Sequence, residues 1–214
     1  MTGETVVLRT DVPDSEVLER ASMLIREGKV VVYPTETLYG FGADAGNVDA
    51  IRRINGLKGR EGAKPVLVIV DTVETLRPFV AEITREARSL MRAFWPGPLT
   101  LVFKASQAAS SELTAGTGTI GARVPSSKFC RELVAACGRP ITSTSANRAG
   151  APPLAGIEEI RNAFPHGVDL FIDGGKRLSG APSTVIDVST SSPRLLREGA
   201  IPWDLIQRSF HQDS

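Results

Sequence analysis

The sequence is poor in the residues that hold metal ions or form disulfide bonds. Its 214 residues include two histidines and two cysteines. Cys130 and Cys137 fall in a segment with a helical pattern, where two turns separate Cα atoms by ~10.5 Å, beyond the ~7 Å that a disulfide allows. We therefore expect two free thiols, as in a reducing cytoplasm, and no metal cage. A Ser-His-Asp triad would require His166, which follows Pro165 in a polar turn, and is disfavoured.

The sequence also lacks long apolar runs and an excess of one charge. No apolar run approaches the ~18 residues of a membrane span, and the first twelve residues contain no apolar signal core. Lys and Arg number 25 against 24 Asp and Glu, so no overall field draws the chain to nucleic acid or membranes. We expect a soluble cytoplasmic protein without membrane contact, in which any RNA contact would need a local basic patch.

Strand and helix patterns alternate irregularly along the chain. Apolar runs predict strands at 6–8, 30–33, 66–70, 99–103, 119–124, 141–143, 170–173, 184–188 and 194–197. Helical spacing and capping residues predict helices at 15–28, after Asn47, at 83–94, from Ser126 or Ser127 to Gly138, and after Pro202. Because several successive strands have no helix between them, the fold is predicted to be α+β (mixed α/β), with a twisted mixed parallel and antiparallel sheet and flanking helices. No linker divides the chain, so we expect one domain over residues 1–214.

Polar residues gather where the predicted strands end. These groups are residues 34–40, Lys58 to Lys64, Arg123, residues 143–147, and Ser183 with Arg197. Each alone has an ordinary explanation, such as a turn, a solvated charge run or a helix cap. Arg123 lies in a strand pattern, so it needs either solvent or an anionic partner. Together, the cations and hydroxyls are typical of a site for phosphates and a carboxylate.

One glycine pattern is misleading. Gly116-x-Gly118-x-x-Gly121 matches the dinucleotide-binding string, which requires a strand before it and a helix after it. Here a Ser-rich loop precedes the glycines and a strand ending at Pro125 follows them. The sequence also has no Gly-x-x-x-x-Gly-Lys-Ser/Thr phosphate loop. Neither of the common nucleotide-binding loops is therefore predicted.

The polar groups resemble a known family. Lys58-x-Arg60 followed by Ser145-x-Asn147 is similar to the signature of the YrdC-type threonylcarbamoyl-AMP synthases. Further motifs follow in the family's order, at residues 34–40, 64–65, 95–100, 123–125, 182–186 and 196–199, so the resemblance runs from about Val30 to Gly199. It implies a YrdC-like fold with a concave binding face, in the short form of the family.

The resemblance also implies an activity and a site. Family members are nucleotidyltransferases that condense L-threonine, bicarbonate and ATP, with Mg²⁺, to threonylcarbamoyl-AMP and pyrophosphate for tRNA modification, and downstream tRNA threonylcarbamoyl-transferase proteins are the implied partners. The implied residues around L-threonine are Thr37, Arg123, Ser143 and Ser183. Those around ATP are Lys58, Arg60, Lys64, Thr119, Ser145, Asn147 and Arg197, with Lys58 and Arg60 catalytic.

The sequence departs from the family at three positions and leaves alternatives open. Glu61 stands where Pro often follows the Lys-x-Arg motif, Ile69 where some members have His, and Pro153 where some have Ser. One alternative is a double-stranded RNA-binding relative without synthase activity. Another is a carbamoyl-transfer domain like that of hydrogenase-maturation proteins, although those normally carry acylphosphatase and zinc-finger-like segments, which are missing here.

Overall fold

The computed structural model describes residues 3–7, 15–59, 65–175 and 181–210, whose strands form two mixed sheets. The first sheet has the order β1 (Glu4–Val7), β9 (Leu170–Asp173), β2 (Val31–Pro34), β3 (Tyr39–Gly42) and β8 (Thr144–Ser145). The second has the order β11 (Arg194–Arg197), β10 (Thr184–Asp187), β5 (Leu99–Lys104), β6 (Thr119–Arg123), β4 (Val68–Ile69) and β7 (Ile141–Thr142). The mixed α/β class is confirmed, with the sheet divided in two.

Parallel and antiparallel pairs occur in both sheets. In the first, β2 pairs with β9 in parallel and with β3 in antiparallel orientation. In the second, β5 pairs with β10 in parallel and with β6 in antiparallel orientation. The mixed pairing expected from the irregular alternation of strands and helices is therefore present in each sheet.

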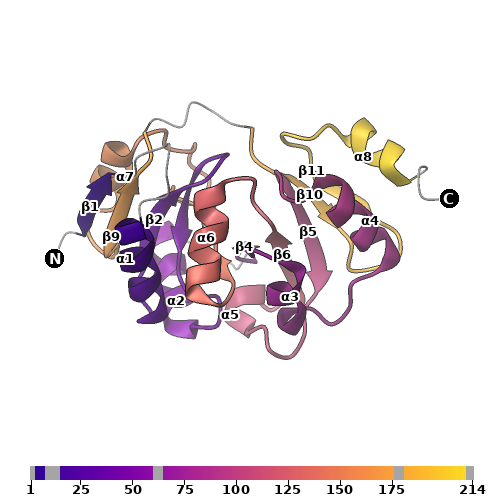
Figure 1. Ribbon diagram of the computed structural model, residues 1–214, viewed down its shortest axis with the longest axis horizontal. Coiled ribbons are helices and arrows are strands. Elements are labelled where there is room, and N and C mark those ends of the chain that lie inside the picture. The colour runs from indigo at the N-terminus through magenta and orange to yellow at the C-terminus, as the bar shows by residue number, and fades with distance from the viewer. Residues whose placement is uncertain (1–2, 8–14, 60–64, 176–180, 211–214) are drawn as a thin grey trace.

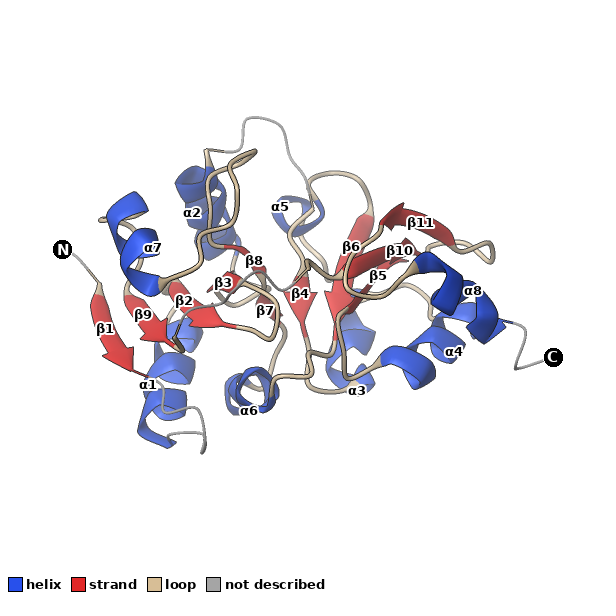
Figure 2. Ribbon diagram, turned by 90° about the horizontal axis from the view of Figure 1, so that it is seen from above, coloured by secondary structure: helices blue, strands red, loops and turns tan. Residues whose placement is uncertain are grey.

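Helices cover both faces of the strands. They are α1 (Ser15–Arg26), α2 (Val48–Lys58), α3 (Val73–Leu76), the 3-10 helix η1 (Arg77–Phe79), α4 (Arg85–Phe94), α5 (Ser111–Thr114), α6 (Lys128–Cys137), α7 (Ile157–Ala163) and α8 (Trp203–Phe210). Figure 1 shows α1 and α6 side by side in front of the strands. Figure 2 shows the strands from β1 to β11 in a row, with α1, α6, α3 and α4 on one face and α2, α5 and α7 on the other.

Local signals fixed the ends of several helices. The side chain of Asn47 accepts a hydrogen bond from the backbone N–H of Ala50 and caps α2, and Ser127 caps α6 at the backbone N–H of Cys130. Gly138 ends α6 with a φ of 67°, in the left-handed region that glycine adopts without steric cost. Cys130 and Cys137 are free and buried, as predicted. No helix within the described ranges has the length and apolar character that crossing a membrane requires.

Strand β3 was not predicted, because Tyr39-Gly40-Phe41-Gly42 resembles a turn in composition. The strand forms because its backbone packs against the ring of Tyr33 in β2. A Cβ atom added to Gly42 would lie 2.6 Å from a ring carbon of Tyr33, so no larger residue fits there. Phe41 is fully buried on this strand. Tertiary packing therefore overrides local propensity at β3.

The chain crosses between the two sheets at Ser143. Strand β7 ends at Thr142 in the second sheet, and β8 begins at Thr144 in the first. The backbone N–H of Ser143 donates to the carbonyl of Leu67 at 2.7 Å, and the hydroxyl of Thr142 donates to the carbonyl of Phe41 at 3.0 Å. These bonds hold the crossing point against both sheets. The residues around Ser143 therefore belong to the seam where the sheets meet.

Candidate functional site

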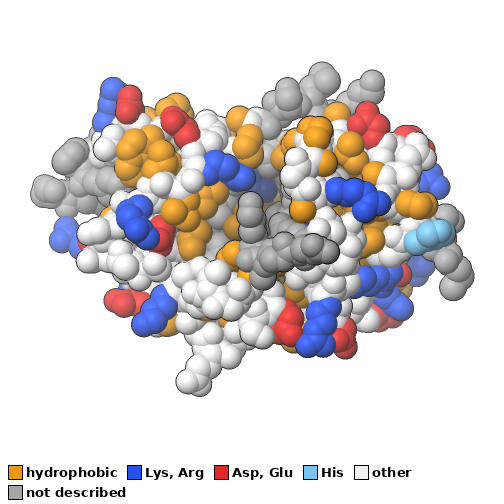
Figure 3. All heavy atoms as spheres, turned by 180° about the vertical axis from the view of Figure 1, so that it is seen from behind, with side chains coloured by type: hydrophobic (Ala, Val, Ile, Leu, Met, Phe, Trp, Pro, Cys, Tyr) orange, Lys and Arg blue, Asp and Glu red, His pale blue; other side chains and the backbone are white. Residues whose placement is uncertain are grey.

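A cavity of about 280 Å³ lies at the seam between the two sheets. Figure 3 shows that the face opposite the view of Figure 1 is hollowed near its middle, with Lys and Arg side chains beside the hollow. The lining comes from segments throughout the chain: Thr35, Thr37, Leu38, Tyr39, Gly40, Pro65, Leu67, Val68, Thr100, Arg123, Ser143, Thr144, Ser145, Pro182, Ser183, Val185 and Arg197. The first sheet supplies β3 and β8, and the second supplies β4, β5, β6, β10 and β11.

The structure brings most of the predicted site residues together. The four residues implied for L-threonine all line the cavity: Thr37, Arg123, Ser143 and Ser183. Two of those implied for ATP, Ser145 and Arg197, line it as well. Lys58, Thr119 and Asn147 do not line it. Arg60 and Lys64 lie outside the described residues. One cavity therefore gathers predicted groups from residue 37 to residue 197, while the roles of these residues stay predictions.

A tight turn between β2 and β3 holds Thr37 at the cavity. The hydroxyl of Thr35 donates to the carbonyl of Leu38 at 2.6 Å, and its oxygen accepts from the backbone N–H groups of Thr37 and Leu38 at 3.1 Å each. These three bonds use the one proton and both lone pairs of Thr35. The hydroxyl of Thr37 lies 3.0 Å from that of Thr35 and lines the cavity, where it can accept from a ligand N–H or O–H or donate to a ligand acceptor.

Arg123 lines the cavity as a buried cation with a partly buried anionic partner. Its Nη1 lies 2.7 Å from Oε1 of Glu36, and the side chains are 7% and 18% exposed. The contact is an ion pair without the alignment of a hydrogen bond. The sequence required solvent or an anionic partner for Arg123, and Glu36 is that partner. Because the guanidinium has five N–H donors in a planar fork, it can also bind a carboxylate in the cavity.

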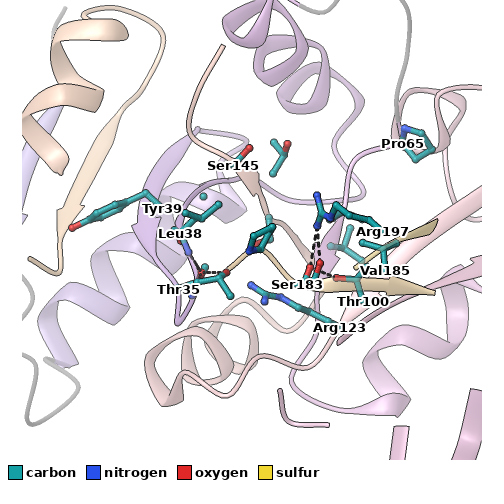
Figure 4. Close-up of a pocket in the computed structure, with 17 residues that line it drawn as sticks. Thr35, Leu38, Tyr39, Pro65, Thr100, Arg123, Ser145, Ser183, Val185 and Arg197 are labelled. Atoms are coloured by element: carbon teal, nitrogen blue, oxygen red, sulfur yellow. Dashed lines mark hydrogen bonds between the residues drawn. The ribbon is translucent and has the colours of Figure 1, made fainter. Parts of the chain in front are cut away.

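Ser183 joins a network on the second sheet. Its hydroxyl lies 2.8 Å from that of Thr100, and Arg197 donates to the Ser183 carbonyl at 2.9 Å, as Figure 4 shows. Partial burial first, and the nearby charge of Arg123 second, lower the pKa of Arg197 from its ordinary value. Two guanidinium groups thus repel each other at the cavity, and a bound anion would relieve this repulsion.

The floor beneath Ser143 is fully buried. Tyr33 lies there with no exposed surface, and its hydroxyl donates to the carbonyl of Thr142 at 3.0 Å. Burial raises the pKa of Tyr33 well above its ordinary value. The phenol therefore stays protonated and neutral under the charged side chains of the cavity, where it supports the crossing point at Ser143.

Three of the residues predicted for ATP do not line the cavity. Lys58 ends α2, is 3% exposed and donates to the loop at residues 145–147. Asn147 in that loop is 8% exposed, and its side-chain amide donates to the carbonyl of Ala151. The hydroxyl of Thr119 lies 2.9 Å from that of Thr117 at the start of β6. Their roles toward a nucleotide stay predictions.

Sequence reasoning missed several groups at the site. Thr35 and Glu36 lie within the polar stretch singled out after β2, but neither received a role. Thr100 was placed in a strand and in the motif at residues 95–100 without a role, yet it is 1% exposed with its hydroxyl against Ser183. A hydroxyl in an otherwise apolar strand is a signal that could have indicated a polar partner, because a buried hydroxyl needs one.

The site suits a small anionic ligand that also carries hydrogen-bond donors. Arg123 and Arg197 can only donate, whereas the hydroxyl of Thr37 can also accept. Within the described ranges, the lining contains no Asp or Glu, and no group of three His, Cys, Asp or Glu side chains could hold a metal ion. A cavity of this size lies near the lower end of the volumes typical of small-molecule sites. An amino acid meets these requirements.

Comparisons with known proteins agree with this chemistry. A family model named for Sua5, YciO and YrdC, and described as "Telomere recombination", matches residues 23–199. Threonylcarbamoyl-AMP synthase of Pyrococcus abyssi is 38% identical over 188 residues, which cover 88% of this chain and 55% of that protein. The synthase of Thiobacillus denitrificans is 40% identical over 170 residues, which cover 78% of this chain and 88% of that one. The chain thus spans about half the length of the P. abyssi relative.

Solved structures share the fold. P. abyssi Sua5 complexed with L-threonine matches with a TM-score of 0.89 at 35% identity, covering 98% of this chain and 61% of that one. Escherichia coli YciO matches with a TM-score of 0.85 at 29% identity, covering 94% of this chain and 97% of that one. The first of these relatives is described as holding the amino acid that the sequence motifs implied.

Proposed function

The chain belongs to the Sua5/YciO/YrdC family, and from this membership we propose that it condenses L-threonine, bicarbonate and ATP to threonylcarbamoyl-AMP and pyrophosphate. One observation carries the proposal. Thr37, Arg123, Ser143 and Ser183, the residues that the motifs implied for L-threonine, meet in a single cavity. Relatives that bear the name of this synthase, and a neighbour complexed with L-threonine, support the same activity.

We infer the orientation of L-threonine from the hydrogen-bond donors and acceptors that line the cavity. Arg123, as a donor, binds the carboxylate. Thr37 accepts from the amino group, because the neighbouring Glu36 carboxylate makes this side of the turn favourable for positive charge. The network of Ser183 and Thr100 faces the remaining polar group, the side-chain hydroxyl of threonine. Apolar lining from Leu67, Val68 and Val185 would contact its methyl group.

The chemical step joins two anions. The amine nitrogen of threonine, once deprotonated, forms a bond to the carbon of bicarbonate with loss of water, which gives a carbamate. A carbamate oxygen then attacks the α-phosphorus of ATP, and the bond to pyrophosphate breaks. Fixed cations lower the repulsion between the anions, as in other phosphoryl-transfer sites. We assign this role to Arg197 and, among residues outside the described ranges, to Arg60 and Lys64.

We propose that Mg²⁺ enters as part of the MgATP substrate. Among the described residues, none that lines the cavity is an Asp or Glu that could hold the ion. We further propose that residues 1–214 form one domain, which the crossing of the chain between sheets at Ser143 supports. A cytoplasmic setting is supported by the two buried free thiols. The product, a reactive mixed anhydride, would pass to tRNA threonylcarbamoyl-transferase proteins.

The proposal is tested by pyrophosphate release. Protein is incubated with MgATP, bicarbonate and L-threonine, and each is omitted in turn. We expect release only in the complete mixture, and slower release when L-serine replaces L-threonine. Release that does not depend on L-threonine would refute the proposal. Double-stranded RNA binding without turnover would favour the RNA-binding alternative.

Arg60→Ala is expected to stay folded and lose pyrophosphate release, and wild-type release from this variant would count against the assignment of Arg60.

A further inference from the structure

The ammonium group of Lys58 is enclosed by the loop at residues 145–147. Its Nζ donates to the backbone carbonyls of Ser145 and Asn147, the latter at 2.8 Å, and lies 3.4 Å from Oδ1 of Asn147. The ring of Phe41 lies below it, with its centre 5.7 Å from Nζ. The side chain is 3% exposed and does not line the cavity. Lys58 is therefore in contact with a loop that itself borders the cavity.

Two backbone hydrogen bonds also hold this loop and the residues that follow it. The backbone N–H of Ala149 donates to the carbonyl of Lys58 at 2.8 Å, and that of Ala146 donates to the carbonyl of Tyr39 at 2.9 Å. The end of α2 thus holds the loop through both its backbone and its side chain, while β3 holds it from the other side. Ser145, which directly precedes Ala146, lines the cavity. These hydrogen bonds hold the backbone on which Ser145 lies.

The geometry directs the ammonium group of Lys58 at the loop. An ammonium group has three N–H donors, and the loop offers two backbone carbonyls and, at 3.4 Å, the side-chain oxygen of Asn147. A phosphate could draw Nζ away from the loop only by weakening these charge-assisted hydrogen bonds, which is unfavourable. We infer that Lys58 is a positioning residue: it fixes the loop that presents Ser145 to the nucleotide, instead of contacting phosphate itself. This inference rests on the proposed function and revises the catalytic role implied by the motif.

The contact between Lys58 and Asn147 gives a structural reason why the Lys-x-Arg and Ser-x-Asn motifs occur in one chain. Lys58 at the end of α2 and Asn147 in the loop contact each other directly, so each half requires the other. In contrast, Ser143 at the crossing point is held by the hydrogen bond from its backbone N–H to the carbonyl of Leu67. A change at Lys58 is therefore expected to disturb the nucleotide side of the cavity and to leave the L-threonine side largely unaltered.

The test compares three variants in the full chain. Lys58→Met removes all three hydrogen bonds with little change in length, and Lys58→Gln keeps two donors without the charge. Arg52→Met is the matched control, because Arg52 lies on the same helix in an exposed ion pair with Glu112. Hydrogen exchange of the unliganded protein is measured at the amides of residues 145–149. KM for ATP and kcat of pyrophosphate release, and Kd for L-threonine, are measured on the same samples.

We expect exchange at Ala149 and its neighbours to be about tenfold faster in Lys58→Met, as the loss of a charge-assisted hydrogen bond implies. KM for ATP should rise about tenfold, Kd for L-threonine should stay within about twofold, and Lys58→Gln should recover part of both losses. Arg52→Met should match the wild type. Unchanged exchange, with the glutamine variant as defective as the methionine variant, would show a direct charge contact and overturn the inference. If the wild type shows no L-threonine-dependent turnover, the proposed function fails, while the exchange result still decides whether Lys58 holds the loop.

Discussion

The ion pair of Arg123 and Glu36 allows structural and ligand-binding contributions to be separated. In Arg123→Met, the carboxylate of Glu36 stays in its position without a countercharge, and it is only 18% exposed. Removing one partner of a buried pair costs about 3–5 kcal/mol. We expect the lower end, about 3 kcal/mol, because Glu36 retains some contact with water. For a protein of this size, that loss corresponds to a fall in Tm of about 6–12 °C.

Binding of L-threonine should fall for a different reason. Arg123 is expected to form charge-assisted hydrogen bonds to the carboxylate of L-threonine, and such bonds contribute about 1.5–3 kcal/mol. At about 1.4 kcal/mol per factor of ten, Kd for L-threonine should rise about 10- to 100-fold in Arg123→Met. Titration calorimetry measures the binding, and urea unfolding at pH 7 measures the stability of the same variant.

The double variant Glu36→Met with Arg123→Met separates the two effects. Replacing a buried ion pair with apolar side chains of similar volume is often neutral. We therefore expect the double variant to unfold within about 1 kcal/mol of the wild type, while L-threonine binding stays as weak as in Arg123→Met. A double variant as unstable as Arg123→Met would refute the account of the ion pair. Tight L-threonine binding by either variant would refute the role of Arg123 as the carboxylate ligand.

Three further predictions concern other parts of the cavity and core. Thr37→Val should weaken binding of L-threonine and L-2-aminobutyrate about fivefold, leaving that of 3-hydroxybutyrate unchanged, because only the first two carry an amino group. Equal losses for all three in calorimetry would refute the proposed contact between Thr37 and the amino group. Gly199→Ala should lower unfolding free energy by about 1–3 kcal/mol and weaken L-threonine binding, because the new Cβ would lie 2.1 Å from the carbonyl of Pro182 and 2.7 Å from the backbone of Ser183. Burial raises the pKa of Cys137 to about 12, so almost none of it is thiolate at pH 8. Disulfide reagents should label it only as the protein unfolds, and rapid labelling of the native protein would contradict this.

The sequence predicted the elements whose signals are local. Helix α6 begins after Ser127 and ends before Gly138 as expected, because capping depends on residues within one turn. Strands β9 and β11 match their predicted limits. Strand β3 could not be predicted, since the packing of Gly42 on Tyr33 depends on a neighbouring strand and not on propensity. The division into two sheets likewise depends on which strands pair, which no local pattern specifies.

At the site, the sequence indicated which residue types take part but not what they contact. The motifs implied Arg123, yet its partner Glu36 is distant in sequence and is identified only by the fold. Lys58 is the clearest case. Its acceptors include two backbone carbonyls, which every residue possesses and which no motif can mark. A conserved-looking lysine beside a proposed phosphate site therefore resembled a ligand, whereas the structure surrounds it with a loop.

The arrangement of the cavity at the sheet seam has a consequence for synthesis on the ribosome. Thr37 is made early, but Ser183 and Arg197 come from β10 and β11 and their flanks, close to the last described helix. A nascent chain that stops before residue 183 lacks Ser183, Val185 and Arg197 from the lining of the hollow. A ligand stabilises a protein only when it binds the folded form, and here the folded form has the whole cavity. Free amino acid should therefore protect the released protein from proteolysis, while ribosome-bound fragments that end before β10 gain no such protection.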